Sequence, residues 1–445
     1  MDLLFLTAYV AFPVLLVLLM RLFGLPLGRF SILGLLLITI FIFDYFGTLP
    51  LYFAWIEYRY LTGVQDKYLI FIILCLTSWT MLGLVFGFVG AGSVFGRLSD
   101  GFYRQPIRPL HEAEGKASLF LLLVCVVALG LYLYHVPKTA IWAALTQGLP
   151  AAKLARSAMT NDFPGKYHWY KVMMSDMMMV ILFTLYAHWQ LKRSRSAFNW
   201  FCITLGVSAF VAIMATEKAP IVFLLIGLFL TNVIVRHQGK YPIGRGLVFG
   251  IFSLAVLIMF YLKFMGSGNA EAAFAAVLSR AFTGQISPAY YYLEYFPAHH
   301  DFLWGASFPN LHGLLPHTPY NLPVEIMNWK FPDVEQSGVV GSAPTIFWGE
   351  MYANFGYLGA IIAPFFVGIG LYIVSALLER FENTPLKVGL VVWIALHYKD
   401  LAITGLSNFT EDFYLVVVVM LWLLAVLAAN MGKLRLYRPH LKDNL

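Results

Sequence analysis

Cationic side chains lie where apolar stretches meet polar ones. Arg280 ends an alanine-rich stretch that begins at residue 270, and Glu217 and Lys218 form a tight turn between two apolar runs. The arginine fork binds two phosphate oxygens at once, whereas lysine presents a compact charge. Arg280 and Lys218 are therefore candidates for binding an anionic lipid headgroup. The alternatives are an ordinary helix-end cation for Arg280, and a mutually neutralising pair for Glu217 and Lys218.

A second group of cations occupies the polar segment 135–170, which contains Lys138, Lys153, Arg156 and Lys166. Lys153 and Arg156 are three residues apart and would share one face of a helix. A solvated face is the default interpretation of such a group. A phosphate-binding patch that includes Arg156 is the alternative.

Acidic side chains beside or inside apolar stretches are costly and tend to be functional. Glu350 lies where a long polar segment returns to an apolar run. This carboxylate is a candidate general base, and equally a strut that pairs with Arg280 or Lys218. Asp44 lies well inside the second apolar run, so we expect it to face a cavity or a partner.

The segment 265–341 is rich in aromatic and imidazole side chains. Aromatic faces can stack on sugar rings, and imidazoles bond hydroxyls; an interfacial aromatic belt would use the same residues without a sugar. The candidate sugar-binding residues are Tyr291, Tyr295, Trp304 and Tyr352. The histidines eligible as bases beside Glu350 are His299, His300, His312 and His317, of which His300 and His312 are the selected candidates.

Several common catalytic motifs are missing from the sequence. It has no Asp-x-Asp pair, no phosphate-binding G-x-x-x-x-G-K-[ST] loop and no H-E-x-x-H. We therefore expect no metal and no other cofactor. The cysteines Cys75, Cys125 and Cys202 lie in apolar runs and are expected to be buried small hydrophobes, neither disulfide-bonded nor metal ligands.

The elements that must position these residues are membrane helices. The 445 residues are 60% hydrophobic and 12% charged, about half the charge of an ordinary soluble chain. We predict an all-α polytopic membrane protein, a single integral membrane domain over 1–445 with about eleven transmembrane helices of about 20 residues each. The runs lie near 3–20, 31–54, 68–96, 118–135, 171–190, 197–215, 219–235, 246–264, 352–378, 387–402 and 412–430. The first run lacks a basic leader and a cleavage site, so we expect it to be a retained helix.

Orientation follows from the basic residues, which are concentrated in one set of short connections. The positive-inside rule puts that set in the cytoplasm. Because topology explains the basic residues, we expect no nucleic acid as a partner. A smaller loop, 135–170, and a large loop, 265–341, then face outward. In the large loop we expect an amphipathic helix over 270–282. A second helix is predicted to begin at Ser287 and Pro288 and to stop before Pro297.

Four stretches of the sequence resemble bacterial oligosaccharide repeat-unit polymerases of the Wzy type, which make O-antigen, capsule and exopolysaccharide. The stretches are 217–220 (EKAP), 280–285 (RAFTGQ), 302–310 (FLWGASFPN) and 342–359, which contains SAPT and WGEMYANFGYLG. The resemblance covers roughly the second half of the chain and the plan of many helices with one large outer loop. It implies a fold like that of membrane glycosyltransferases using lipid-linked donors.

The function that the resemblance implies is transfer of a glycan from undecaprenyl diphosphate to the non-reducing end of another lipid-linked unit. Arg280, Lys218 and Arg156 would hold the diphosphate. The expected surroundings are the bacterial inner membrane and its lipids, with the active face on the periplasmic side, and a flippase and chain-length regulators as partner proteins. Two alternatives remain open: a flippase for the same lipid-linked oligosaccharide, and an O-antigen ligase-type transferase.

Overall fold

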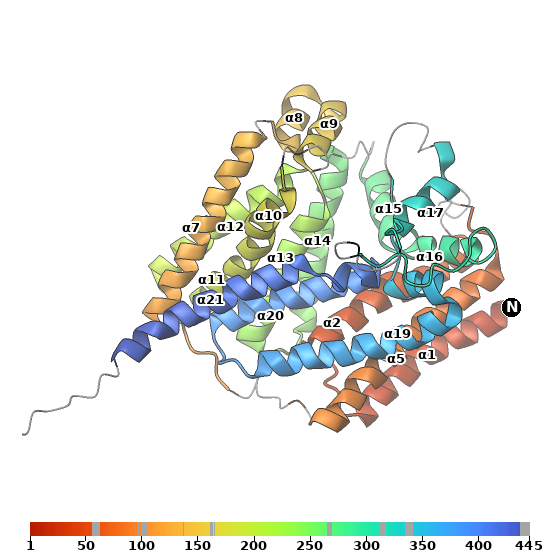
Figure 1. Cartoon of the computed structure of the whole chain (residues 1–445), viewed down its shortest axis with the longest axis horizontal. Helices are drawn as coiled ribbons and strands as arrows, with labels where there is room; N and C mark the ends of the chain where they lie inside the picture. The colour runs from red at the N-terminus through yellow and green to blue at the C-terminus, as the bar shows by residue number, and fades with distance from the viewer. Residues whose placement is uncertain are drawn as a thin grey trace, which may run out of the picture. The chain divides into compact units, whose positions relative to one another are not determined.

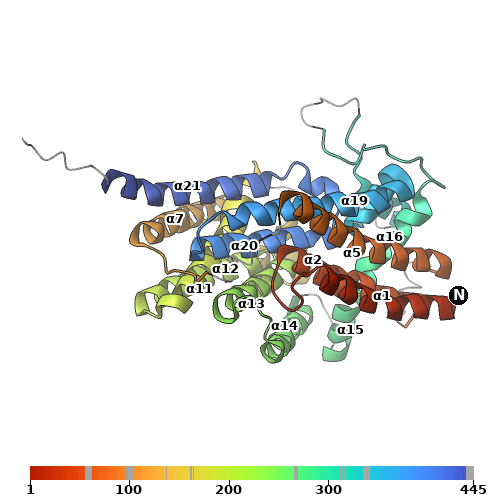
Figure 2. The ribbon, with the colours of Figure 1, turned by 90° about the horizontal axis from the view of Figure 1, so that it is seen from below.

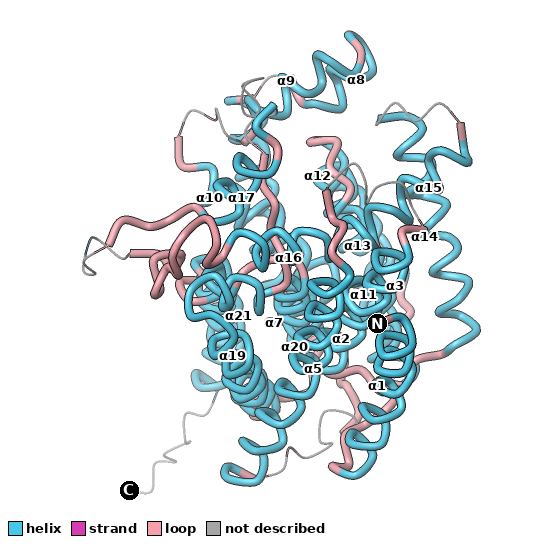
Figure 3. The backbone as a smooth tube through the Cα atoms, turned by 90° about the vertical axis from the view of Figure 1, so that its right-hand side faces the viewer, coloured by secondary structure: helices cyan, strands magenta, loops and turns pink. Residues whose placement is uncertain are grey.

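The structure is a computed structural model that describes residues 1–55, 63–96, 98, 105–136, 138–160, 163, 165–264, 269–310, 313, 317–333 and 341–436. Within these ranges the regular elements are helices and no strand occurs, as Figure 3 shows. The predicted all-α polytopic membrane class is confirmed. Among the described residues, ten helices are long and apolar enough to cross a membrane: Asp2–Leu22, Ile32–Phe53, Lys67–Phe95, Glu112–His135, Tyr167–Lys192, Arg195–Met214, Ala219–His237, Ile243–Lys263, Phe347–Glu379 and Leu406–Asn430.

Eleven transmembrane runs were predicted, and the run at 387–402 is the one that is not among these ten helices. It forms helix α20 (Pro385–Tyr398), which has 14 residues, followed by the 3-10 turn η4 (Lys399–Ala402). At 1.5 Å per residue such a helix is about 21 Å long, shorter than the roughly 30 Å hydrocarbon layer.

By internal contacts the chain divides into two compact units, and α20 continues from the second into the first. The first unit comprises 1–99, 268–380 and 395–412. Figure 1 labels most of its helices. Its elements are α1 (Asp2–Leu22), α2 (Ile32–Thr39), η1 (Ile40–Tyr45), α3 (Phe46–Phe53), α5 (Lys67–Phe95), α15 (Ala270–Ala281), α16 (Thr283–Tyr295), α17 (Leu322–Lys330), α19 (Phe347–Glu379), η4 and η5 (Leu406–Phe409).

The second unit comprises 100–267, 381–394 and 413–445. Its elements are α7 (Glu112–His135), α8 (Ala140–Gln147), α9 (Leu149–Met159), α10 (Tyr167–Lys171), η2 (Val172–Met177), α11 (Met178–Lys192), α12 (Arg195–Met214), α13 (Ala219–His237), α14 (Ile243–Phe264), most of α20, and α21 (Phe413–Leu436). The segment 135–170 is thus partly helical, and Arg156 lies in the last turn of α9.

Helices α5 and α19 pack side by side in the first unit, as Figure 2 shows. Glycines make this close approach possible: a Cβ atom at Gly83 would lie 2.8 Å from the Cβ of Pro364. The indole N–H of Trp79 donates to the carbonyl of Ile361 at 2.8 Å. Small residues are the usual means by which membrane helices bring their backbones together. The close packing of α5 against α19 therefore supports the segment that leads into the start of α19.

The large predicted loop contains the expected amphipathic helix, because α15 spans Ala270–Ala281. The predicted start of the next helix at Ser287 was wrong, since α16 begins at Thr283 and carries Pro288 in its interior. A proline there removes one backbone hydrogen bond. Burial explains why the helix persists: most of α16 is buried, and it packs against α3, α5 and α19. Tertiary packing overrides the local signal.

The prediction for the cysteines holds for only one of them. Cys125 is buried, whereas Cys75 and Cys202 are exposed; all three are free thiols. Cys75 and Cys202 lie on membrane-spanning helices. An apolar run predicts contact with a nonpolar environment, but it does not distinguish a protein interior from lipid.

Candidate functional site

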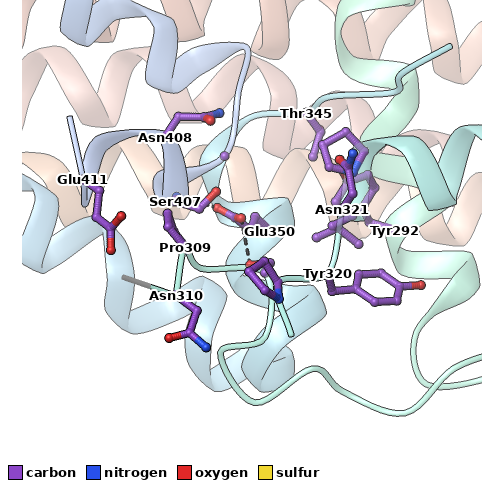
Figure 4. A pocket seen from close by; sticks show the side chains of 15 residues that line it. Tyr292, Pro309, Asn310, Tyr320, Asn321, Thr345, Glu350, Ser407, Asn408 and Glu411 are labelled. Carbon is purple, nitrogen blue, oxygen red and sulfur yellow. Dashed lines mark hydrogen bonds between the residues drawn. The ribbon is translucent and has the colours of Figure 1, made fainter. Parts of the chain in front are cut away.

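A polar pocket of about 460 Å³ lies in the first unit, where the segment after α16, the start of α19 and the turn η5 meet. Figure 4 shows Glu350 near its centre, with Tyr320 and Glu411 on opposite sides in that view. The described residues that line it are Tyr292, Ser307, Pro309, Asn310, Pro319, Tyr320, Asn321, Leu322, Pro323, Thr345, Glu350, Gly405, Ser407, Asn408 and Glu411. Drug-sized and sugar-sized ligands occupy cavities of this volume.

Glu350 joins two walls of the pocket. The hydroxyl of Ser307 donates to its Oε1 at 2.8 Å, and the backbone N–H of Ser407 donates to its Oε2 at 2.9 Å. Gly405 makes room for the carboxyl group, because a Cβ atom there would lie 2.7 Å from Cδ of Glu350. Glu350 is 5% exposed. Its partners are hydroxyl and N–H groups, and Arg280 of the same unit is not among them, so that predicted ion pair was wrong.

A kink in α19 anchors the loop that carries Ser307. Phe355 and Gly356 depart from helical geometry, and Gly356 has φ +64° and ψ −155°, a conformation suited to glycine. A break there leaves carbonyls of the preceding turn without helical partners. The carbonyls of Ala353 and Asn354 instead accept the N–H groups of Leu303 and Trp304, each at 3.0 Å. The kink thus docks the loop on the helix.

Asn354 completes this attachment with its side chain. Its Oδ1 accepts the N–H of Gly305 at 2.9 Å, and its Nδ2 donates to Oγ of Ser307 at 2.8 Å. Glu350 and Asn354 are four residues apart, so they share one face of α19 and contact the same serine. Two side chains of one helix therefore fix Ser307 at the pocket wall.

The pocket offers groups suited to a ligand rich in hydroxyls. Amides, hydroxyls and carboxylates line it together with the rings of Tyr292 and Tyr320. The hydroxyl of Thr345 is buried and has no hydrogen-bond partner among the described residues. Burial raises the pKa of the hydroxyls of Tyr292 and Tyr320, and the hydroxyl of Tyr295 beside Tyr320 adds to the rise. Both phenols stay neutral at ordinary pH.

His300 lies behind the wall formed by Tyr320 rather than in the pocket lining. Its ring centroid is 5.3 Å from that of Tyr320 and 6.0 Å from that of Tyr295, and Nδ1 bonds the carbonyl of Asp301 at 2.6 Å. His299 packs on Trp329 at 5.1 Å. His312, the other selected histidine, lies outside the described residues.

The four candidate sugar-binding aromatics fall into two groups. Tyr291 and Tyr352 are buried, at 2% and 4% exposure, and the hydroxyl of Tyr352 donates to the carbonyl of Phe296 at 3.1 Å. Trp304 is 76% exposed, and Tyr295 is half-buried. Only Tyr295 and Trp304 are open to a ligand in this conformation. Neither lines the pocket, whose aromatic lining residues are Tyr320, which is half-buried, and Tyr292, which is buried.

Arg280 lies in the last turn of α15 and is exposed. It makes no hydrogen bond or ion pair in the part of the chain that the structure describes. By contrast Lys330, another cation of this unit, is paired with Glu294 at 2.6 Å. A charge held at a helix end without an acidic partner remains available to an anion.

The other two candidate diphosphate ligands come together in the second unit. Arg156 pairs with Glu217 at 3.3 Å, and Lys218 donates to the hydroxyl of Tyr261 at 2.6 Å while lying 4.0 Å from its ring centroid. The predicted alternative, in which Glu217 and Lys218 neutralise each other, is thereby corrected: each has another partner. One cation is paired with an acid, and the other is held by an aromatic ring.

Sequence reasoning missed the connection between α20 and α21. Gly405, Ser407, Asn408 and Glu411 line the pocket from there. The available signal was a polar run, 404–412 (TGLSNFTED), between two apolar runs. In the same region Asp412 is hydrogen-bonded to His397 of α20, and Lys399 forms an ion pair with Asp400.

Asp44 was expected to face a cavity or a partner. It is fully buried in η1, and neither carboxylate oxygen has a hydrogen-bond partner among the described residues. We have no physical account of its role. Among the described residues no group of three or more His, Cys, Asp or Glu side chains is arranged to hold a metal ion.

Comparisons with protein-family models, with curated proteins and with solved structures find no match to this chain.

Proposed function

We propose that this chain is a membrane glycosyltransferase that polymerises lipid-linked oligosaccharide repeat units. One observation carries the proposal: two of the four stretches that bear the resemblance meet at one pocket although they are separated in the sequence. Ser307, Pro309 and Asn310 come from 302–310, and Thr345 and Glu350 come from 342–359. If these two stretches resembled the family only through a composition common to membrane proteins, we would not expect them to meet around one buried carboxylate.

The pocket is proposed to hold sugar residues of the acceptor. Tyr320 supplies an aromatic face, and Asn310 and Asn321 supply groups that bond hydroxyls. Glu350 is proposed chiefly as a positioning residue, because its oxygens already hold Ser307 and Ser407. Of the described candidates for general base, Glu350 borders the pocket and His300 lies behind Tyr320.

The reaction would join an acceptor hydroxyl to the anomeric carbon of the donor. The carbon–oxygen bond to undecaprenyl diphosphate breaks, the acceptor proton passes to the base, and the lipid diphosphate leaves. Arg280 is the cation assigned to the diphosphate, since it is exposed and has no acidic partner among the described residues. Lys218 and Arg156 belong to the other unit and remain predicted headgroup contacts.

The direct test incubates the purified full chain with a synthetic undecaprenyl diphosphate-linked repeat unit. A ladder of products spaced by one repeat unit is the expected result. Transfer of the glycan to lipid A core in place of a second unit would indicate a ligase. Movement of the intact lipid-linked unit across a vesicle membrane, without bond cleavage, would indicate a flippase. Either result would replace the proposal.

A further inference from the structure

The charged residue types in the described lining of the pocket are all acidic. Glu350 and Glu411 line it, and none of its described lining residues is lysine, arginine or histidine. Lys330 and Lys399, two cations of the same unit, are each paired with an acid outside the lining. An anionic group placed in the pocket would therefore meet carboxylates without a compensating cation from these walls.

Glu411 is the carboxylate best placed to act on a ligand. It is exposed, and within the described chain it makes no hydrogen bond or ion pair. Glu350, by contrast, is buried and held by Ser307 and Ser407. Among the described lining residues, the acidic side chain without a partner is thus Glu411, on the side opposite Tyr320 in the view of Figure 4.

The pocket also has features that call for a polar ligand, independently of its acids. The hydroxyl of Thr345 is buried and unpartnered at its wall, although buried hydroxyls normally find a partner. Amide groups of Asn310, Asn321 and Asn408 line the same space. A molecule bearing several hydroxyls suits a lining of amides and hydroxyls, and its net charge decides how it meets Glu411.

We infer that the sugar occupying this pocket is uncharged or carries an amine, and that Glu411 excludes sugars bearing a carboxylate. This inference rests on the proposed function, since it names the class of sugar that the transferase accepts. Like charges that approach closely near a protein surface repel, so exclusion of a uronic acid by about tenfold or more is expected.

The test measures binding of three tetrasaccharides to the purified full chain in detergent by titration calorimetry. One is built from neutral N-acetylglucosamine, one from glucosamine and one from glucuronate. The variants are Glu411→Gln, which removes the charge, and Glu411→Lys, which reverses it. Glu271→Gln is the matched control, because Glu271 is an exposed acid of the same unit that does not line the pocket. Melting temperatures verify that the variants remain folded.

The unmodified chain should bind the neutral and amino tetrasaccharides at least about tenfold more tightly than the uronate. Glu411→Gln should narrow that ratio, Glu411→Lys should favour the uronate, and Glu271→Gln should change nothing. Equal binding of all three sugars, a ratio insensitive to both Glu411 variants, or no binding of any of them overturns the inference. A polymer ladder obtained beside such a result would leave the proposed function standing. Expected binding without a ladder would overturn the function instead.

Discussion

Ser307 and Glu350 are 43 residues apart in the chain and are joined by a hydrogen bond of 2.8 Å from the serine hydroxyl to the carboxylate. The bond links the segment after α16 to the first turn of α19. The other carboxylate oxygen of Glu350 accepts the N–H of Ser407 in η5. One buried carboxylate thus connects three pieces of chain that form the pocket.

Removing that carboxylate should destabilise the protein. Glu350→Ala leaves the N–H of Ser407 and the hydroxyl of Ser307 without their acceptor, and each buried unsatisfied group costs about 1–3 kcal/mol. Ser307→Ala removes a donor and should cost less. We expect a clear fall in melting temperature for Glu350→Ala, a smaller one for Ser307→Ala and none for the exposed control Glu271→Ala. Equal melting temperatures for Glu350→Ala and the unmodified chain would show that Glu350 does not hold the pocket together.

The kink of α19 allows a comparison between two glycines of one helix. Gly356→Ala forces a side chain into φ +64° and ψ −155°, so a loss of about 1–3 kcal/mol is expected. Gly370→Ala is the control, because a Cβ atom there meets no atom within 4 Å. It should be neutral or slightly stabilising. Thermal unfolding of both variants decides the matter, and equal stability would mean that the kink is not required.

The fold class could be predicted from the sequence because long apolar runs have few structural solutions in lipid. Arg280 was correctly placed at the end of a helix, since alanine spacing and a polar boundary are local signals. The start of α16 could not be predicted in the same way. Ser287 and Pro288 carry a valid local start signal, but contacts with α3, α5 and α19 decide the boundary.

The candidate site was only half predictable. Glu350 could be singled out because a carboxylate at the edge of an apolar run is costly. Its partner Ser407 could not, since a serine in a short turn has no signal of its own before the turn is placed in space. Similarly, Tyr291 and Tyr292 are neighbours in sequence, yet only Tyr292 lines the pocket. Which face of α16 is turned inward depends on packing far from it in the chain.

Topology provides a prediction that is independent of the chemistry. The distribution of basic residues predicts that the segment 265–341 faces away from the cytoplasm. A cysteine at the exposed position Asp333 should therefore react with an impermeant thiol reagent added to spheroplasts. The unmodified chain, which has Cys75 and Cys202 on membrane-spanning helices, gives the background. Labelling that requires permeabilised membranes would reverse the orientation.

Polymerisation should not need a divalent metal. The sequence has no Asp-x-Asp pair, and a cation such as Arg280 can neutralise a leaving diphosphate directly. Ladder formation should therefore persist in excess EDTA at an unchanged rate. Loss of the ladder, restored by magnesium or manganese and not by calcium, would show that an ion holds the diphosphate.

Arg280 provides the most demanding prediction. It is exposed at the end of α15 without an acidic partner, so its replacement should leave stability intact. If its guanidinium binds the departing diphosphate, Arg280→Lys and Arg280→Ala should both slow polymerisation by roughly 100-fold or more, because one ammonium cannot reproduce a bidentate contact. Arg21→Lys, at an exposed arginine ending α1, is the matched control and should polymerise normally. Turnover and melting temperature are measured on each variant. Near-normal ladders from both Arg280 variants would remove this residue from the site, whereas a lowered melting temperature would indicate a structural role.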